Sequence, residues 1–403
     1  MAINIFSSPR EIYYGAGAIE SVTQILGKRV LIVTDPGVKN QGLADRLGEI
    51  VKGQGAALAI FDQVEPDPSR ETAGRILSLA QDFQPDLFIG LGGGSSIDAG
   101  KAAWVLYENP DWIHLSVIEV AQKILQCVLR KKARLIAIPT TSGTGSEATK
   151  TAVVTDLTRT PPYKSAWSAP QIVPDAAILD PELTVTMPAQ ITANTGFDAL
   201  SHAVECYVLT SPSDMVDALA IWSARTICEW LPRAVANGRD LQARDRMHMA
   251  SLQAGLAFTN GTLGLVHMLA HVIGAEFHIP HGRAIAYMLC PVFAFFYSTR
   301  RERLVGLAKA LDIQGTDDRA KVQALLNFLN QLKKDIGLPL SIKDTELSET
   351  QFFSRLDSVI EGYKTRLGVL DPMMRPILGV PDSIEEVRAL LLHAWNGTTA
   401  DLK

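Results

Sequence analysis

The sequence predicts an α/β protein, with a parallel Rossmann-like sheet in its N-terminal part and an all-helical C-terminal part. Through the first half, short β-branched runs ending in Gly, Pro, Asp or Thr recur. Amphipathic stretches of helix length lie between the early runs, and this alternation is typical of parallel strands joined by crossover helices. After residues 176–183 strand-like runs all but vanish, and long Ala/Leu-rich helical patterns follow.

The expected elements follow from these patterns in chain order. Strands are expected at residues 29–35, 57–64, 86–94, 134–141 and 151–156. Helices are expected at residues 42–55, 71–83, 215–235 and 383–395, and the Ile/Leu periodicity of 112–133 suggests another. We therefore expect an α/β dinucleotide-binding domain over residues 1–183 and a helical domain over residues 184–403.

Composition narrows the class of partner. With 403 residues, 47% hydrophobic and 20% charged, the chain has the composition of a globular protein with an ample core. Its formal net charge of −5, without a Lys/Arg block, favours a small-molecule partner over nucleic acid or a membrane. The N-terminus lacks a secretory leader pattern, and the apolar run 284–297 is too short to span a bilayer. We expect a cytoplasmic protein.

A glycine-rich turn follows the third expected strand. In "DLFIGLGGGSSIDAGKAAW" the strand runs into three glycines and two serines, and a helical pattern begins near Ile97. Glycines let the backbone approach a ligand closely, and a helix N-terminus offers unpaired N–H groups to phosphate. The stretch is not the dinucleotide fingerprint G-x-G-x-x-G, so a tight turn without a ligand is the alternative.

A second turn of this kind, "IPTTSGTGSEAT" (138–149), leaves the next strand and precedes an expected helix. Because parallel strands present their carboxyl ends at one sheet edge, the two turns together predict a pyrophosphate-bearing ligand there. Asp35 ends the strand 29–35, where a carboxylate can accept from a ribose 2′-hydroxyl and repel a 2′-phosphate. A turn Asp before Pro36 and Gly37 is the competing interpretation.

Histidines and one aspartate recur at metal-ligand spacing in the second half. Asp198 and His202 lie four residues apart, so on a helix they share a face, and His267 and His271 repeat the spacing. Pro280 should break the second helix and put His281 on a turn folding back to that face. Singly, each histidine is more typical of a core or surface position. The repeated pair indicates a transition-metal site, of a kind that suits Zn²⁺ or Fe²⁺ better than Mg²⁺ or Ca²⁺.

Five segments of the chain together resemble the iron-containing (group III) alcohol dehydrogenase family in order and spacing, from about residue 5 to 300. They are "GGGSSIDAGK", "IPTTSGTGSEAT", "LDPELT", "GFDALSHAVECY" and "GLVHMLAHVIGAEFHIPHGRAIA". The resemblance implies a nicotinamide-cofactor domain, a helical domain and a divalent metal, usually Fe²⁺ and in some relatives Zn²⁺. The implied metal ligands are Asp198, His202, His267 and His281. His271 matches a non-ligand histidine thought to move protons, and is the implied catalytic residue.

The cofactor residues implied by the resemblance are Asp35, Asp67, Gly93, Gly94, Ser95, Asp98, Thr140, Thr141, Thr144, Lys164 and Leu183. Asp35 favours NAD over NADP, and Asp67, where many relatives have Asn, would disfavour a phosphorylated ribose further. Phe258 and Asn260 are the expected pocket residues near the metal. The segment 371–383, "DPMMRPILGVPDS", departs from the family's C-terminal pattern.

The function that the resemblance implies is reversible hydride transfer between NAD(H) and a small alcohol or aldehyde whose oxygen the metal holds. A homodimer or larger homo-oligomer is expected from the family. One alternative is an NAD- and metal-dependent lyase on the related dehydroquinate-synthase-like scaffold. The other is a non-catalytic nucleotide-binding protein whose metal clamps the helical domain.

Overall fold

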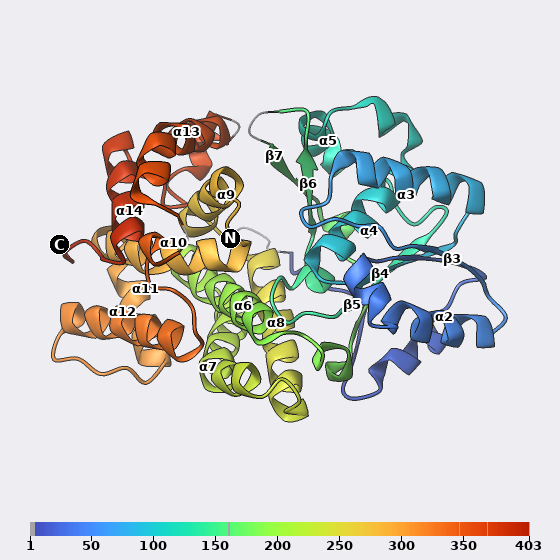
Figure 1. Cartoon of the computed structure of the whole chain (residues 1–403), viewed down its shortest axis with the longest axis horizontal. Coiled ribbons are helices and arrows are strands. Elements are labelled where there is room, and N and C mark those ends of the chain that lie inside the picture. The colour runs from blue at the N-terminus through green and yellow to red at the C-terminus, as the bar shows by residue number, and fades with distance from the viewer. Residues whose placement is uncertain (1–4, 160–161, 346, 369, 403) are drawn as a thin grey trace. The chain divides into compact units, whose positions relative to one another are not determined.

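The computed structural model describes residues 5–159, 162–345, 347–368 and 370–402. The chain forms two compact units (Figure 1). The sheet unit comprises Met1–Met187 with Gly238–Asn260, and the helical unit comprises Pro188–Asn237 with Gly261–Lys403. Residues 238–260 thus group with the sheet unit, although they follow residue 184 in the chain. The domain division at residue 184 stays a prediction.

The sheet unit is built on a parallel six-stranded sheet of order β1-β8-β5-β4-β2-β3. Its strands are β1 (Glu11–Tyr14), β2 (Arg29–Val33), β3 (Ala57–Phe61), β4 (Leu87–Gly92), β5 (Arg134–Pro139) and β8 (Ala176–Leu179). Four of the five expected strands lie in this sheet. The chain direction across the sheet reverses between β2 and β4, and open α/β sheets bind ligands beyond the strand ends at such points.

Helices cover both faces of the sheet (Figure 1). Leu31 and Val33 of β2 join the core that contains α3 (Arg70–Phe83) and α4 (Gly94–Glu108). Val30 and Ile32, which point the other way, join the core that contains α2 (Leu43–Gly53) and the 3-10 helix η1 (Ala18–Gln24). Because β2 carries apolar side chains on both faces of the sheet, helices must cover both faces. This arrangement confirms the predicted Rossmann-like class. The remaining helices of this unit are α1 (Pro36–Asn40), α5 (Val117–Lys123) and α8 (Leu241–Asn260).

Three local predictions differ from the structure. Residues 151–156 form β6 (Thr151–Asp156), but β6 pairs antiparallel with β7 (Tyr163–Ser168) in a separate two-stranded sheet. Burial alternates over its first four residues, with Ala152 and Val154 buried and Thr151 and Val153 partly exposed, as suits a sheet with one buried face. The helix expected after 138–149 is only the 3-10 turn η4 (Ser146–Ala148). Of residues 112–133, α5 takes only seven, and its Val117 carbonyl accepts from Trp167 Nε1 of β7 at 2.9 Å.

The helical unit contains only helices among its described residues. They are α6 (Ala189–Leu209), α7 (Asp214–Ala236), α9 (Leu265–Phe277), α10 (His281–Phe295), α11 (Tyr297–Ala310), α12 (Asp318–Asp335), α13 (Glu349–Gly368) and α14 (Ile384–Asn396). The long helix α6 packs against α7 and α10, and α9 packs against α10 and α13. This arrangement brings α6, α9 and α10 together, and these helices carry the aspartate and histidines singled out above.

No single helix of the described ranges is long and apolar enough to cross a bilayer. Only α8 and α9, counted together as a bent pair, reach that length and hydropathy.

Candidate functional site: a glycine-rich turn and a histidine cluster

The glycine-rich turn joins β4 to α4. The helix begins at Gly94, three residues before the predicted start, and its N-cap residue Gly93 provides no side-chain cap. The first amides of this 15-residue helix therefore lack the usual side-chain acceptor, which leaves a site suited to phosphate. A Cβ atom at Gly94 would lie 2.7 Å from Thr144 Cγ2. Glycine is thus required where the second turn closes on the first.

The second turn, residues 138–149, is called the threonine turn below. The amide of Thr140 donates to the carbonyl of Gly92 at 2.9 Å, which ties this turn to the glycine-rich one. Thr141 lies beside Gly93, and Thr144 Oγ1 accepts from the Ser146 amide at 3.2 Å. The two turns therefore meet at one edge of the sheet, as parallel strand ends require.

Helix α8 packs on the threonine turn. A Cβ atom at Gly255 would lie 2.7 Å from the carbonyl oxygen of Gly145, so only a glycine at 255 allows this close approach. A buried hydrogen bond of 2.9 Å joins Ser142 Oγ to His248 Nδ1. Burial lowers the pKa of His248 to about 4, so its ring is neutral at pH 7. The sequence assigned His248 no chemistry, and its contacts make it a brace for the turn.

Asp35 acts as a turn aspartate and also contacts α4, and its ribose-reading role stays a prediction. Its Oδ1 accepts from the amides of Gly37 and Val38 at 2.9 and 3.0 Å and caps α1, as a turn aspartate would. Its Oδ2 accepts from the Ser96 hydroxyl at 2.9 Å. Ser96 belongs to the first turn of α4, so the carboxylate stands beside the glycine-rich turn.

Asp67, Lys164 and Ser95 also come together. Lys164 Nζ lies 2.7 Å from Asp67 Oδ1, and the Asp67 amide donates to Ser95 Oγ at 3.2 Å. This contact brings β7 to the glycine-rich turn. Because Lys164 neutralises Asp67, the extra negative charge inferred from the sequence is largely compensated.

The contacts of Asp98 and Leu183 are with other parts of the fold. Asp98 accepts from the Val153 amide at 2.9 Å and from the Ser146 hydroxyl, so its two oxygens hold the threonine turn and β6. The side chain of Leu183 is 1% exposed and packs in the hydrophobic core. Direct cofactor contacts by these two residues stay predictions.

The two expected pocket residues lie near the end of α8. Asn260 Oδ1 accepts from the Ser7 amide at 2.6 Å, and its Nδ2 donates to the Ser7 carbonyl at 2.9 Å. The Asn260 amide therefore anchors the N-terminal segment. Phe258, two residues earlier, is half-buried, and a substrate contact by either residue stays a prediction.

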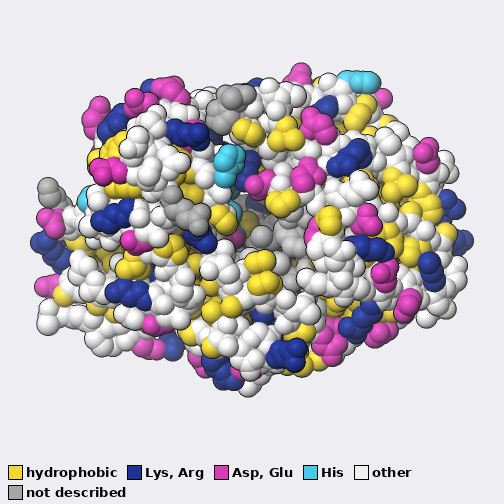
Figure 2. All heavy atoms as spheres, in the orientation of Figure 1, with side chains coloured by type: hydrophobic (Ala, Val, Ile, Leu, Met, Phe, Trp, Pro, Cys, Tyr) yellow, Lys and Arg dark blue, Asp and Glu magenta, His cyan; other side chains and the backbone are white. Residues whose placement is uncertain are grey.

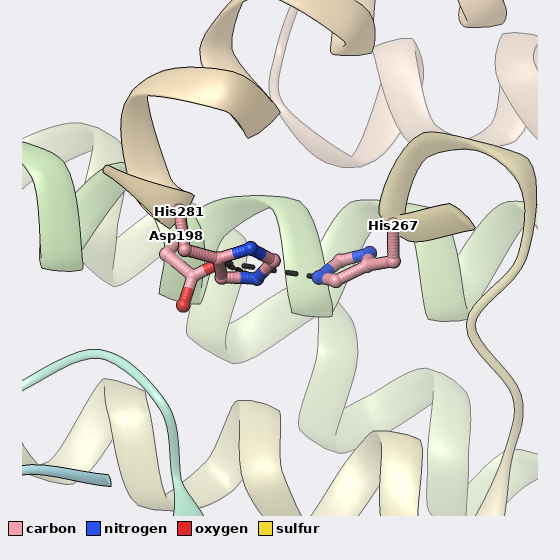
Figure 3. A group of neighbouring side chains, drawn as sticks. All are labelled: Asp198, His267 and His281. Carbon is pink, nitrogen blue, oxygen red and sulfur yellow. Dashed lines mark ion pairs between the residues drawn. The ribbon is translucent and has the colours of Figure 1, made fainter. Parts of the chain in front are cut away.

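The histidine cluster lies within the helical unit, where Asp198, His267 and His281 point toward one another from α6, α9 and α10 (Figure 3). Asp198 Oδ1 is the common neighbour: it lies 3.5 Å from His281 Nε2, 3.8 Å from His202 Nε2 and 3.9 Å from His267 Nε2. The ligand atoms of Asp198, His267 and His281 all lie within 4.8 Å of one another. His202 stacks on His267 with ring centroids 4.7 Å apart.

These distances suit a metal ion. Bonds of about 2.0–2.2 Å to a tetrahedral cation would separate its ligand atoms by about 3.3–3.6 Å, so a small contraction completes the site. Asp198 Oδ1 and His267 Nε2 are buried, and neither has a hydrogen-bond partner among the described residues. Without a cation, burial raises the pKa of Asp198 to about 7, although nearby His267 lowers it. Buried polar atoms without hydrogen-bond partners are typical of a metal-ligand set, in which a cation would balance the carboxylate charge.

Local sequence explains how His281 reaches the cluster. His278, with φ +55°, ends α9, and Pro280 is the N-cap of α10. His281 is consequently the first residue of a helix, and not part of the loop that the sequence suggested. A Cβ atom at Gly282 would lie 2.1 Å from the Asn194 carbonyl oxygen, so glycine lets α10 press its first turn against α6.

The cluster is more open on one side. The side chain of His281 is 31% exposed, whereas those of Asp198, His202 and His267 are 5–8% exposed. His271, half-buried on α9, stacks on His281 with ring centroids 4.8 Å apart. The implied auxiliary histidine therefore stands at the accessible side.

Sequence reasoning missed Glu205. This fully buried carboxylate on α6 lies 2.5 Å from His267 Nδ1 through Oε2 and accepts from the Val266 amide at 2.8 Å through Oε1. Its position seven residues after Asp198 and three after His202 places it along the same helix face, a spacing that could have identified it.

On the face drawn in Figure 2, basic and acidic side chains are interspersed, and the described residues there form no large patch of one sign.

Comparison with known proteins gives consistent matches. The family model described as "Iron-containing alcohol dehydrogenase" matches residues 9–181, and "Fe-containing alcohol dehydrogenase family, C-terminal" matches residues 192–372. The NADPH-dependent butanol dehydrogenase of Clostridium saccharobutylicum is 38% identical over 361 residues, covering 88% of this chain and 90% of that protein. The NAD-dependent methanol dehydrogenase of Bacillus methanolicus is 35% identical, covering 86% and 90%. A crystal structure of 1,3-propanediol oxidoreductase aligns with a TM-score of 0.87 at 29% identity, covering 98% and 100%.

Proposed function

The chain belongs to the iron-containing alcohol dehydrogenase family, and on that premise we propose that it transfers a hydride reversibly between NAD(H) and a small alcohol or aldehyde. The observation that carries the proposal is the convergence of three imidazole nitrogens on Asp198 Oδ1. A site of three nitrogens and one carboxylate suits a transition metal that assists chemistry at a substrate oxygen.

We propose that Asp198, His202, His267 and His281 hold this metal, as Fe²⁺ with Zn²⁺ as the alternative. Bound there, a divalent ion would supply Lewis acidity toward the substrate oxygen, an effect of several kcal/mol. Asp198 offsets part of the ion's charge, and the buried rings of His202 and His267 exclude water from one side. The more exposed His281 marks the side from which substrate would approach.

The sheet unit is the proposed cofactor site. The uncapped N-terminus of α4 would bind the pyrophosphate, with the threonine turn against it. NAD would supply the hydride-accepting carbon. Asp35 supports NAD over NADP, because its carboxylate beside Ser96 would repel a 2′-phosphate. The two relatives named above differ in this respect, one being NADPH-dependent and the other NAD-dependent.

His271 is the proposed proton carrier. It stacks on His281 at the open side, and an imidazole is the side chain best suited to hold or release a proton near neutral pH. In alcohol oxidation its ring nitrogen would accept the hydroxyl proton and pass it to solvent.

Neither alternative gains support. The family models and the relatives reported above are alcohol dehydrogenases, which argues against the lyase. A merely clamping metal would not need a more exposed ligand with a second histidine beside it. The cytoplasmic location and the homodimer or larger assembly stay predictions.

A direct assay tests the proposal. Chelator-treated protein is restored anaerobically with Fe²⁺ or Zn²⁺, and NADH oxidation by a panel of short aldehydes is followed by absorbance. Metal-dependent turnover of any aldehyde is the expected result. Tight NAD binding without turnover under either metal would return weight to the lyase or the non-catalytic alternative.

A further inference from the structure

We propose that Glu205 is a positioning residue of the metal centre: it holds the ring of His267 and fixes the ring proton on Nδ1, so that Nε2 faces the metal with its lone pair free. The proposal rests on the proposed metal centre, because it assigns His267 Nε2 to the metal.

The geometry joins one carboxylate to two groups of α9. Glu205 Oε2 lies 2.5 Å from His267 Nδ1, and Oε1 accepts from the Val266 amide at 2.8 Å, within the first turn of α9. The side chain of Glu205 is 0% exposed, so water does not compete for either contact. One side chain on α6 thus sets both the start of α9 and the orientation of its first histidine.

Hydrogen-bond chemistry then fixes the tautomer. An ionised carboxylate only accepts, so the short contact requires a proton on His267 Nδ1. In the neutral ring the other nitrogen, Nε2, must carry the lone pair. Nε2 is the atom that lies 3.9 Å from Asp198 Oδ1, and it has no hydrogen-bond partner among the described residues. Metal-ligating histidines usually donate their second N–H to such a partner.

Charge supports the same assignment. No lysine or arginine of the described residues forms an ion pair with Glu205, whose ion-pair partner is the His267 ring. A buried carboxylate needs compensation, and Asp198, which faces the opposite nitrogen of the His267 ring, adds a second negative charge. A divalent cation bound to His267 would balance both. The Glu205 charge would also make His267 a stronger donor to that cation.

The test is Glu205→Gln. The amide oxygen can still accept from the Val266 amide, but the amide NH₂ then faces His267 Nδ1 as a donor and favours the Nε2-protonated ring. We expect the Kd for Zn²⁺, measured by competition with a chromophoric chelator, to rise 10–100-fold. The Tm of the metal-free protein should change little, because the cap on α9 is kept.

Glu108→Gln is the matched control. Glu108 is a buried carboxylate of the sheet unit that accepts from the Lys132 and Ala133 amides at 2.9 Å. Its loss should leave the Kd for Zn²⁺ unchanged. If wild-type protein binds no Zn²⁺, the metal centre itself fails. If wild type binds Zn²⁺ and Glu205→Gln binds within about threefold of it, the role of Glu205 is overturned.

A second measurement needs no variant. In ¹⁵N-histidine NMR spectra of the zinc-loaded wild-type protein, His267 should show a protonated Nδ1 and a metal-bound Nε2. Coordination through Nδ1, or a proton on Nε2, would overturn the proposal even if Glu205→Gln does not fold.

Discussion

The two candidate sites differ in how their polar groups are satisfied. In the sheet unit, Asp35 and Asp98 each engage both oxygens in hydrogen bonds from the protein, and Ser142 is bonded to His248. In the helical unit, Asp198 Oδ1 and His267 Nε2 are buried and have no hydrogen-bond partner in the part of the chain that the structure describes. The cofactor turn therefore has its shape before any ligand binds, whereas the histidine cluster needs a cation for its electrostatic balance.

Asp198→Asn should have the largest effect. The substitution removes the charge at the common neighbour of three imidazoles. We expect metal content to fall to background and turnover to drop on the order of 10³-fold, since several kcal/mol of Lewis-acid assistance is lost. Elemental analysis and steady-state kinetics measure both. Asp217→Asn, which removes a carboxylate paired with Arg303 in the same unit, should keep the metal. Retained metal and activity in Asp198→Asn would contradict the site.

His248→Gln tests, through pH, whether the buried His248 ring of the sheet unit is held neutral. The pKa of His248 is about 4 in the fold against an ordinary 6.5, so between these values the unfolded chain binds the proton and the folded chain does not. Deprotonation of His248 therefore contributes about 3 kcal/mol to the free energy of unfolding above pH 6.5, and this contribution is lost as the pH falls toward 4. Urea unfolding from pH 7 to 4 should show a shallower decline in the variant. An identical decline would mean that His248 is not held neutral.

Gly255→Ala should separate the two sites. The added methyl group meets the Gly145 carbonyl oxygen and must push α8 from the threonine turn, at a cost of about 1–3 kcal/mol. We expect weaker NAD(H) binding by fluorescence titration and an unchanged Kd for Zn²⁺. Gly53→Ala, where a Cβ atom meets nothing within 4 Å, is the control. If Gly255→Ala weakened NAD(H) binding and Zn²⁺ binding to the same extent, the two sites would not be independent.

Asp35→Gly should have the smallest effect. Removing the carboxylate should raise the NADP-to-NAD ratio of kcat/KM by about tenfold, a change of about 1.4 kcal/mol, while glycine largely preserves the cap of α1. Ser96→Ala keeps the charge and removes only its hydrogen bond, so its ratio should stay near that of wild type. An unchanged ratio in Asp35→Gly would exclude the ribose-reading role.

Local patterns made much of this molecule predictable from the sequence. Strands with apolar residues on both faces identify a covered parallel sheet. The i,i+4 pairs of Asp198 with His202 and of His267 with His271 mark helix faces, because that spacing is a property of one helix. Both inferences need only neighbouring residues.

Features that depend on distant contacts were not predictable in this way. β6 pairs antiparallel with β7, although its own residues do not alternate between polar and apolar. Helix α8 joins the sheet unit, where its Gly255 packs on Gly145, 110 residues earlier in the chain. The spacing of Glu205 from Asp198 and His202 marks a shared helix face, but its hydrogen-bond partner, His267, lies 62 residues away, so its role could not be predicted locally. A contact between remote segments leaves no local periodicity.

The most direct test of the account follows the hydride itself. NADH deuterated at the transferable C4 position is mixed with an aldehyde and the Fe²⁺-loaded protein, and the alcohol product is analysed by mass spectrometry. The account predicts one deuterium on the carbinol carbon with wild-type protein and none with chelator-stripped protein or Asp198→Asn. Equal deuterium transfer by the stripped protein, or no transfer by the loaded one across the aldehyde panel, would contradict a metal-dependent hydride transfer.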